Sequence, residues 1–495
     1  MLFLSVWGYY FLFREREIMN KINLASYLLL LVTPGLIVAE TLSIKNFLEQ
    51  VQQNHPFFKK ESLNPEILKT QQKALLGGED WRVNATTSLT HEETGISNAF
   101  TPEKANYANL ETSLSRLYWK TGGQMSLGYS LTRSSQDFSQ GNIKSYQNYV
   151  NLQYVHPLMK NINGILSRLN YELEDYNVQN AEILSLEAKE NFLAELADKY
   201  LDWILQTELL RINNKRLSIS ETEYKRTKRK RSNNLVPKVD VIRSKHAVLR
   251  TKQSLQKVKA DLASILADLS VLSQNQNLLN LTPEYQIYDI KTLPSKTKVN
   301  QSIANNSRLV NSFQLRLDQI DNQLRGLHND KKPELDLIVG AGLLGNDSGF
   351  GDAASINNPQ YSVALNFSYP LGNRNAKANI DQSHLQKMQL EEGKNDLILT
   401  LQAAAAAILE RLSQLEKSLE LDKAQIESSK LKTREELKRY NQGRSELTFV
   451  LQSQDQEQQA EISYAITAIT YHKIYLRYRA LMDELLSTSN NKKGV

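Results

Sequence analysis

Two stretches of sequence decide the fold: NYVNLQYVHPLMKNIN, from Asn148 to Asn163, and YSVALNFSYPLGNRN, from Tyr361 to Asn375. Each alternates apolar with polar residues, ends in Pro-Leu, and continues through an asparagine-containing stretch into a long helical pattern. Alternation with a period of two is typical of a β-strand with one apolar face. Because the prolines, Pro157 and Pro370, stand at the same point of both stretches, we interpret the stretches as equivalent parts of an internal repeat.

The repeat extends on both sides of these junctions. Downstream, SNNLVPKVDVIRSKHAVL from Ser232 corresponds to NQGRSELTFVLQSQDQE from Asn441. Upstream, TLSIKNFLEQVQQNHP from Thr41 resembles TLPSKTKVNQSIANNSR from Thr292, but the first copy holds extra residues before its Pro-Leu. The expected divisions are a signal peptide at 1–39, a first repeat at 40–289 with an extra β-hairpin at about 107–133, a second repeat at 290–485, and a C-terminal tail at 486–495.

The first 39 residues carry an export signal. A short basic start at Met19 precedes an apolar core from Leu24 to Val32, and Ala39 is the small residue expected before a cleavage site. We expect Met19 to be the true start, because the charged residues before it fit poorly in a signal peptide. An uncleaved membrane anchor is the alternative. Export of a chain without cysteine is typical of a bacterial envelope.

The strand-like segments have the pattern of membrane strands. Alternate residues from Leu335 to Leu343 and from Tyr361 to Tyr369 are apolar, and those between them are mostly small or polar. Such alternation is typical of a barrel strand that faces lipid on one side and a lumen on the other. A half-buried strand of a soluble sheet alternates equally well. The export signal favours the barrel.

The connections between these segments alternate in length. We expect long polar loops at about 92–106, 134–147 and 345–359, but a tight turn at 121–123. Membrane barrels have this asymmetry, with short turns on one side and long loops on the other. Six strand-like segments are too few for the smallest barrel, which has eight strands. The barrel interpretation therefore requires several chains.

The helical segments are too long for a compact domain. An unbroken pattern runs from about Asn161 to Arg231, which spans roughly 105 Å at 1.5 Å per residue. Apolar residues recur at steps of three and four from Val241 to Leu272 and again from Leu401 to Leu419. Sustained seven-residue repeats of this kind predict coiled-coil packing.

Composition excludes several function classes. The 495 residues have a mean hydropathy of -0.46, which excludes a bundle of membrane-spanning helices. The chain has no cysteine, so it has no disulfides, thiolate metal sites or cysteine nucleophile. Its seven histidines show no pair at helical metal-ligand spacing, and no phosphate loop or nucleophile elbow is found. We therefore expect no enzyme, no cofactor and no metal.

Together these features resemble the TolC-type outer-membrane efflux family. The residues that carry the resemblance are VHPLMKN from Val155, SYPLGNR from Ser368, and the helix turns at Asn234–Asp240 and Tyr440–Ser445. The likeness covers about residues 40–485. It implies a membrane α+β fold: a duplicated helix–strand–strand–helix repeat, with a trimeric outer-membrane β-barrel continuous with a long periplasmic α-helical coiled-coil barrel.

The resemblance also implies a function and partners. A homotrimer in the outer membrane of a Gram-negative bacterium would contact lipid and dock, through a periplasmic adaptor (membrane fusion) protein, on an inner-membrane pump. It would be the passive exit duct of a tripartite efflux pump or of a type I secretion system. The alternative is a periplasmic or surface coiled-coil protein with a structural or adhesive role.

The resemblance assigns the helix turns to the periplasmic entrance of the pore. The expected entrance residues are Asn234, Asp240, Arg243, Gly443, Glu446, Phe449 and Gln452, and the expected strand–helix junctions are Pro157, Leu158, Pro370 and Leu371. Family members often have acidic residues in both turns, but here only Asp240 stands at such a position. Asn234 replaces the usual glycine, and asparagine tolerates the left-handed conformation.

A basic run, KRTKRKR from Lys225 to Arg231, lies just before the first turn. Such runs occur in nucleic-acid-binding proteins, but the export signal argues against that partner. A solvated helix face is one interpretation, and a contact for an acidic adaptor surface is the other.

Overall fold

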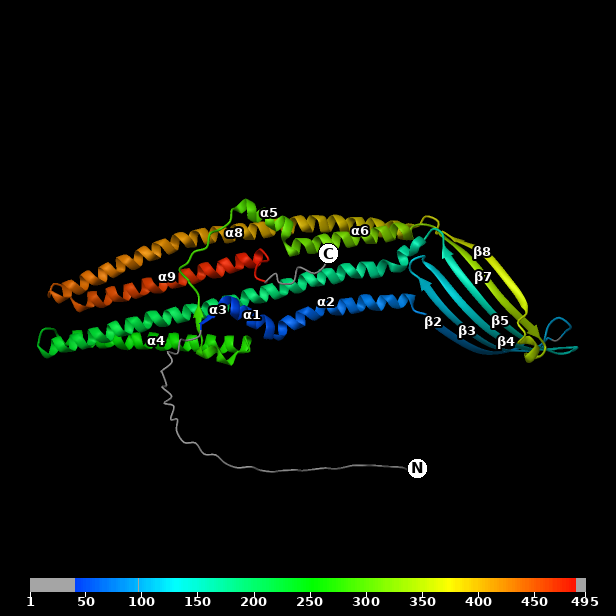
Figure 1. Cartoon of the computed structure of the whole chain (residues 1–495), viewed down its shortest axis with the longest axis horizontal. Coiled ribbons are helices and arrows are strands. Elements are labelled where there is room, and N and C mark those ends of the chain that lie inside the picture. Colours follow the sequence, from blue (N-terminus) through cyan, green and yellow to red (C-terminus); the bar gives the residue numbers. More distant parts are fainter. Residues whose placement is uncertain (1–40, 97, 487–495) are drawn as a thin grey trace, which may run out of the picture. The chain divides into compact units, whose positions relative to one another are not determined.

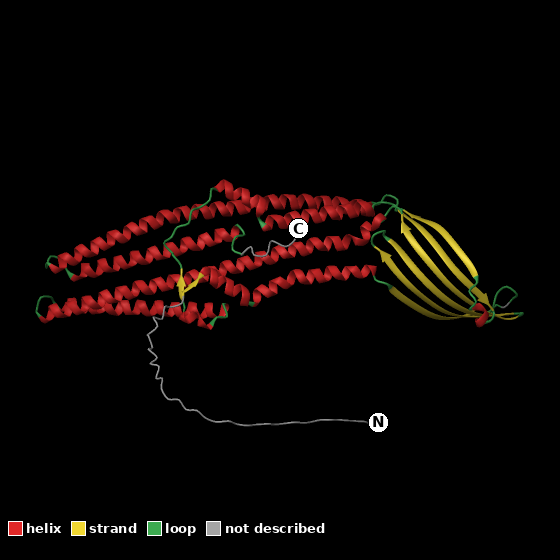
Figure 2. Ribbon diagram, viewed as in Figure 1, coloured by secondary structure: helices red, strands yellow, loops and turns green. Residues whose placement is uncertain are grey.

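The computed structural model describes residues 41–96 and 98–486 (Figures 1 and 2). The expected signal peptide at 1–39 lies outside the described residues, as does the expected tail apart from Leu486. The helices are α1 (Ile44–Asn54), α2 (Pro56–Leu75), α3 (Ile165–Ser232), α4 (Lys238–Leu272), α5 (Lys296–Asn306), α6 (Arg308–Asp330), α7 (Phe350–Ala353), α8 (Arg374–Asn441) and α9 (Leu447–Leu481), with short 3₁₀ helices η1 (Leu76–Glu79), η2 (Ile162–Gly164) and η3 (Gln276–Asn280). The strands are β1 (Thr41–Ser43), β2 (Arg82–Glu93), β3 (Lys104–Tyr118), β4 (Gly123–Phe138), β5 (Gly141–Pro157), β6 (Thr282–Glu284), β7 (Glu334–Asp347) and β8 (Asn358–Ser368).

Six strands form one antiparallel sheet in the order β2-β3-β4-β5-β7-β8. The pairing of β5 with β7, from Tyr146 opposite Asp347 to Pro157 opposite Asp336, joins the two halves of the chain. The segment that we expected as an extra hairpin forms parts of β3 and β4, which pair with β2 and β5 on either side. The extra hairpin is therefore part of this sheet, and not a separate projection.

The expected long loop at 134–147 is wrong. Strand β4 continues to Phe138 and β5 begins at Gly141, so only Ser139 and Gln140 connect them. The physical reason is that residues around Ser134 and Asp137 are polar on both faces of the hairpin. A strand whose two faces both contact water shows no apolar alternation, so its sequence resembles that of a loop.

The long helices form two hairpins of matching length (Figure 1). Helices α3 and α8 each contain 68 residues, which is about 102 Å at 1.5 Å per residue. Their partners α4 and α9 each contain 35 residues. Every residue of the predicted stripe from Val241 to Leu272 is buried or half-buried, and so is every residue of the stripe from Leu401 to Leu419. This confirms that both stripes face neighbouring helices.

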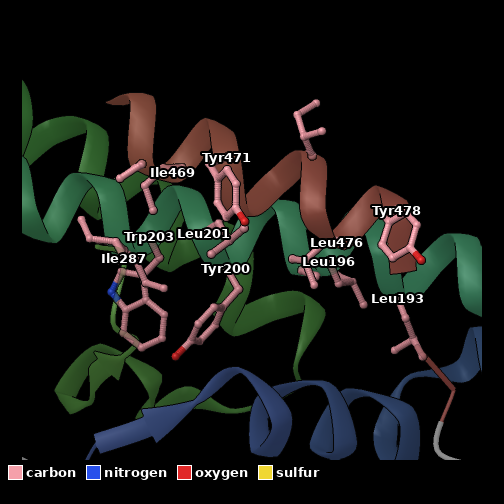
Figure 3. Close-up of a cluster of buried hydrophobic side chains, with 14 of the residues drawn as sticks. Leu193, Leu196, Tyr200, Leu201, Trp203, Ile287, Ile469, Tyr471, Leu476 and Tyr478 are labelled. Carbon is pink, nitrogen blue, oxygen red and sulfur yellow. The ribbon is translucent and has the colours of Figure 1, made fainter. Parts of the chain in front are cut away.

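The main core joins α3 and α9, which belong to different halves of the chain (Figure 3). Tyr200 and Trp203 of α3 are fully buried and meet edge to face, with ring centroids 5.5 Å apart. The hydroxyl of Tyr471 donates a hydrogen bond to the backbone carbonyl of Lys291 at 2.9 Å. Buried aromatic side chains that also satisfy their polar atoms fix the relative position of the helices they join.

A buried histidine completes this core. The ring of His472 lies between Ile287 and Tyr285, with Nε2 2.9 Å from the Ile287 carbonyl and Nδ1 3.0 Å from the Tyr285 hydroxyl. Since a carbonyl only accepts, Nε2–H donates to it, and Nδ1 accepts from Tyr285. Burial lowers the pKa of His472 below its ordinary value. His472 is therefore buried in this core with a neutral imidazole ring.

Candidate functional site

The sheet has one continuous apolar face that no described part of the chain covers. Residues directly opposite in an antiparallel pair lie on the same face, so the register determines its composition. Val83 lies opposite Leu114, Leu114 opposite Leu127, and Leu127 opposite Leu152. Leu152 in turn lies opposite Ala341, which lies opposite Tyr361, so the apolar face crosses every strand of the sheet. Its most exposed members on the edges are Val83, Leu89, Tyr361, Val363, Leu365 and Phe367. Exposed apolar surface on this scale is typical of a site of membrane or protein contact.

The opposite face is polar and built from small residues. Alternate positions of β4, from Ser126 to Ser134, are serine, glycine or threonine. A side chain at Gly128 would clash with Oδ1 of Asn151, and one at Gly342 would lie 2.7 Å from the ring of Tyr149. The glycines therefore leave room for larger polar side chains on the neighbouring strand. Such a face suits contact with water.

The ends of the apolar face carry aromatic and cationic side chains. The guanidinium of Arg116 lies 5.7 Å from the ring centroid of Trp81 and 5.4 Å from that of Tyr118. At the other end, Arg133 lies 5.8 Å from the ring of Tyr146, which stands opposite it on β5. Aromatic and basic residues at the two edges of an apolar band are the pattern found where a protein meets the headgroups of a bilayer.

Both edges of the sheet lack a partner strand within residues 41–96 and 98–486. Strand β2 begins the sheet and β8 ends it, and all of their residues are exposed. An edge strand presents free N–H and C=O groups that can pair with another strand. The sheet is thus open on two sides. Among the described residues, none of the helices contains an apolar stretch long enough to cross a bilayer.

The predicted junction residues lie between strand and helix. Pro157 is the last residue of β5, and the N–H of Leu158 donates to the carbonyl of Leu335 at 2.7 Å. Pro370 and Leu371 follow β8, and Leu371 is exposed. The role of these four residues beyond connecting strand to helix stays a prediction.

An asparagine in the left-handed conformation follows each junction. Asn161 has a φ of 62° and Asn373 has a φ of 44°. The N–H of Asn161 donates to the side chain of Asn329 at 2.7 Å, and the side-chain amide of Asn373 donates to the carbonyl of Lys331 at 2.9 Å. Both asparagines therefore contact the end of α6, and the bond from Asn161 joins the first half of the chain to the second.

At their other ends, the two helix hairpins close in the same way. Asn234 has a φ of 55° and Gly443 a φ of 73°, so both adopt the left-handed conformation. The expectation that Asn234 can adopt this conformation is confirmed. Both turns are closed by a 2.9 Å backbone hydrogen bond, from Leu235 N–H to the Lys230 carbonyl and from Arg444 N–H to the Arg439 carbonyl. Such bonds satisfy the last carbonyls of a helix.

The two turns contact each other across the halves of the chain. The ammonium of Lys230 lies 4.1 Å from the ring centroid of Tyr440 and 3.4 Å from the side-chain oxygen of Asn441. Arg243 lies 4.0 Å from the carboxylate of Glu446. We call residues 225–245 and 432–446 together the paired tip.

The entrance residues expected from the sequence differ in exposure. Asp240 is only 6% exposed and accepts a hydrogen bond from Arg243 at 3.2 Å. Phe449 is 52% exposed, and Glu446 and Gln452 are also exposed. Gln452 and Arg243 line one groove between α4 and α9, with a volume of about 560 Å³. The single chain thus keeps Asp240 inside the tip and leaves Arg243, Glu446, Phe449 and Gln452 accessible.

Sequence reasoning missed an ionic contact that joins three helices next to the paired tip. Arg216 is 3% exposed and donates to Gln454 at 2.9 Å and to Asp455 at 2.8 Å. Arg250 of α4 pairs with the same Asp455. One carboxylate of α9 thereby joins α3 and α4. The only hint of this ion pair in the sequence was an acidic residue, Asp455, in a stretch of glutamines. The sequence does not show which residues of two other helices pair with it.

Comparison with known proteins identifies the fold. No protein-family model matches the chain, and no curated protein is similar to it in sequence. Among solved structures, the outer-membrane channel CmeC of Campylobacter jejuni matches with a TM-score of 0.61 at 12% identity, over 89% of this chain and 85% of that one. The outer-membrane channel MtrE of Neisseria gonorrhoeae matches with a TM-score of 0.62 at 14% identity, over 89% of both chains. The outer-membrane protein VceC of Vibrio cholerae matches with a TM-score of 0.62 at 10% identity, over 89% of this chain and 96% of that one. The chain therefore has the fold of the TolC-type outer-membrane efflux channels, as its sequence motifs predicted.

Proposed function

We propose that this chain is the outer-membrane channel of an efflux pump, a homotrimer whose strands form one barrel and whose helices form a periplasmic tunnel. The observation that carries the proposal is the apolar sheet face, which is continuous over six strands and bounded by aromatic and basic residues. Strands of 11 to 17 residues are long enough to cross a bilayer at the usual tilt. A coiled-coil rod with a structural role has no use for such a face.

The open edges support closure with further copies of the chain. Because six antiparallel strands alternate in direction, β2 and β8 run in opposite directions, and β8 of one copy can pair antiparallel with β2 of the next. The two strands contain 12 and 11 residues, so they match in length. Pairing is constrained further because the apolar faces must be continuous. An odd-numbered residue of β2 must stand opposite an odd-numbered residue of β8.

Three copies give a barrel with an aqueous interior. They supply eighteen strands, and a spacing of about 4.8 Å with a tilt of about 40° corresponds to a diameter of about 36 Å between backbones. Barrels of this strand number leave an aqueous channel. The small and polar residues of the second sheet face would line it. Passage would be passive, with energy supplied by an inner-membrane pump that docks through a periplasmic adaptor.

Disulfide cross-linking between chains tests this arrangement, because the natural sequence has no cysteine. If the helix-proximal ends of β2 and β8 are aligned, Ser88 stands opposite Ser362 on the polar face. We expect the variant S88C/S362C, or one with the second cysteine two residues away at Gln360 or Ala364, to give covalent dimers and trimers after oxidation in the outer membrane. Each chain has a mass of 56.5 kDa, so these products separate clearly on a denaturing gel.

The matched control is S88C/V363C, in which the second cysteine lies on the opposite face of the same strand. It should not cross-link, because a slip of one residue would turn the apolar face inward. The barrel would be refuted if S88C gave only monomers in combination with a cysteine at each of Ser362, Gln360 and Ala364. It would also be refuted if the control cross-linked with equal yield.

A further inference from the structure

The paired tip concentrates positive charge. Residues 225–245 and 432–446 contain fourteen Lys and Arg but only four Asp and Glu, which gives a net charge of +10. The whole chain has a formal net charge of +6, so all other residues together carry −4. Positive charge is therefore localised at one end of the helices.

The acidic residues of the paired tip are already engaged. Asp240 and Glu446 both lie within 4.0 Å of Arg243. Glu435 lies 3.9 Å from Lys438, and Glu436 lies 4.0 Å from Arg439. Each of the four carboxylates thus has a basic partner, and none remains to neutralise the rest.

Most of the basic residues have no such partner. Arg243, Lys438 and Arg439 pair within the tip, and Arg226 lies 3.8 Å from Glu223. In the described part of the chain, the other ten lie more than 4.0 Å from any carboxylate; they are Lys225, Lys228, Arg229, Lys230, Arg231, Lys238, Lys245, Lys432, Arg434 and Arg444. Nine of these ten are exposed, and only Lys230 is half-buried.

The positive charges of both halves act at one place, because the two turns contact each other. Lys230 of the first turn lies against Tyr440 of the second. Burial, together with the nearby Arg226, lowers the pKa of Lys230. This shift is the direction expected where like charges crowd.

We propose that the paired tip makes the periplasmic entrance selective for anions, so that the solutes it admits best are negatively charged. This inference rests on the proposed channel function. Three chains around one axis would bring together roughly thirty net positive charges, and an opening lined by one sign of charge raises the local concentration of the opposite ion. Exposed charges act over a Debye length of about 8 Å at physiological salt, which is comparable to the dimensions of a helix-lined opening.

The experiment measures ion selectivity of the purified full-length channel in planar bilayers. The reversal potential in a KCl gradient gives the permeability ratio of chloride to potassium. The test variant, K228E/R229E/R231E, reverses three exposed and unpaired charges of the first turn. The control variant, K59E/K73E/K298E, makes the same change in net charge at exposed residues of α2 and α5, away from the tip. The neutral variant K228Q/R229Q/R231Q tests whether the effect is graded.

We expect a wild-type chloride-to-potassium ratio above one. It should fall at least about twofold in K228E/R229E/R231E and by less in the neutral variant, and both effects should shrink at 1 M salt, where the Debye length is about 3 Å. A wild-type ratio below one overturns the inference, as does an equal change in the control variant. Either result leaves the channel function intact. Absence of any single-channel current would instead refute the channel function, and the inference with it.

Discussion

Arginine substitutions along β8 would measure how deeply the apolar face lies in a membrane. Val363 is the central residue of β8, five residues from each end. Five residues span about 17 Å along a strand, or about 13 Å along the bilayer normal at a tilt of 40°. The apolar band of an outer-membrane barrel is about 25 Å tall, so in the proposed barrel Val363 would lie near its midplane.

The depth determines the cost of each substitution. An arginine at the midplane costs about 2–4 kcal/mol per chain, and one near the interface costs about 0–1 kcal/mol. We therefore expect Val363→Arg to destabilise most, Leu365→Arg less, and Phe367→Arg, one residue from the end of the strand, least. Three chains in one barrel multiply the penalty, to about 6–12 kcal/mol per trimer for Val363→Arg.

The assay is denaturant-induced unfolding of the protein in phospholipid vesicles, followed by tryptophan fluorescence. The controls are Ser362→Arg and Asn366→Arg, which place the same side chain on the polar face of the same strand. They should change the free energy of unfolding by less than about 1 kcal/mol. An equal loss of stability for Ser362→Arg and Val363→Arg would show that the faces are assigned wrongly. Equal losses for Val363→Arg and Phe367→Arg would show that β8 does not cross the bilayer.

Three further predictions concern the helices. Phe449→Ala should increase single-channel conductance with little loss of stability, because the ring is half exposed; an unchanged conductance would remove Phe449 from the pore. Asp240→Ala should lower the free energy of unfolding by about 1 kcal/mol, since it removes the acidic residue from the first turn of α4 together with its bond to Arg243, whereas Asp240→Asn should lose less; equal melting curves for wild type and Asp240→Ala would contradict this. The free energy of unfolding should fall as the pH drops below about 6.5, because the pKa of His472 is lower in the folded chain than in the unfolded chain, which then binds the proton more readily. A His472→Gln variant should lose this part of the pH dependence in thermal melts. An identical pH profile for the variant and the wild type would show that His472 is not the group responsible.

Periodicity was sufficient to predict most of the architecture. The stripe from Val241 to Leu272 reflects burial against neighbouring helices, and the alternation from Tyr361 to Tyr369 reflects a strand with one apolar and one polar face. Each of these leaves a period in the sequence. The turn at 139–140 was missed because the end of that hairpin meets water on both faces, and no period records such a strand. Alternation in the sequence therefore reveals a strand only where the two faces of the strand have different surroundings.

The candidate site was predictable in place but not in detail. The left-handed conformation of Asn234 follows from its position after a helix, which is a local property. The bridge from Asp455 to α3 and α4 depends on contacts between segments more than 200 residues apart in the sequence. No local pattern encodes which side chain such a segment will meet. The basic run from Lys225 to Arg231 was visible, but its neighbours on the second turn were not.

The equal lengths of the two helix hairpins restrict how such a protein can change by insertion or deletion. Suppose that seven residues are added to both α3 and α4, but none to α8 or α9. The packing between α3 and α4 would be preserved, but the first turn would move about 10 Å beyond the second. Lys230 would then lose Tyr440, and Arg243 would lose Glu446. Related proteins can therefore keep these contacts while lengthening or shortening the helices only if insertions or deletions of about seven residues occur in both hairpins. The two halves of the chain must keep two separate lengths in agreement.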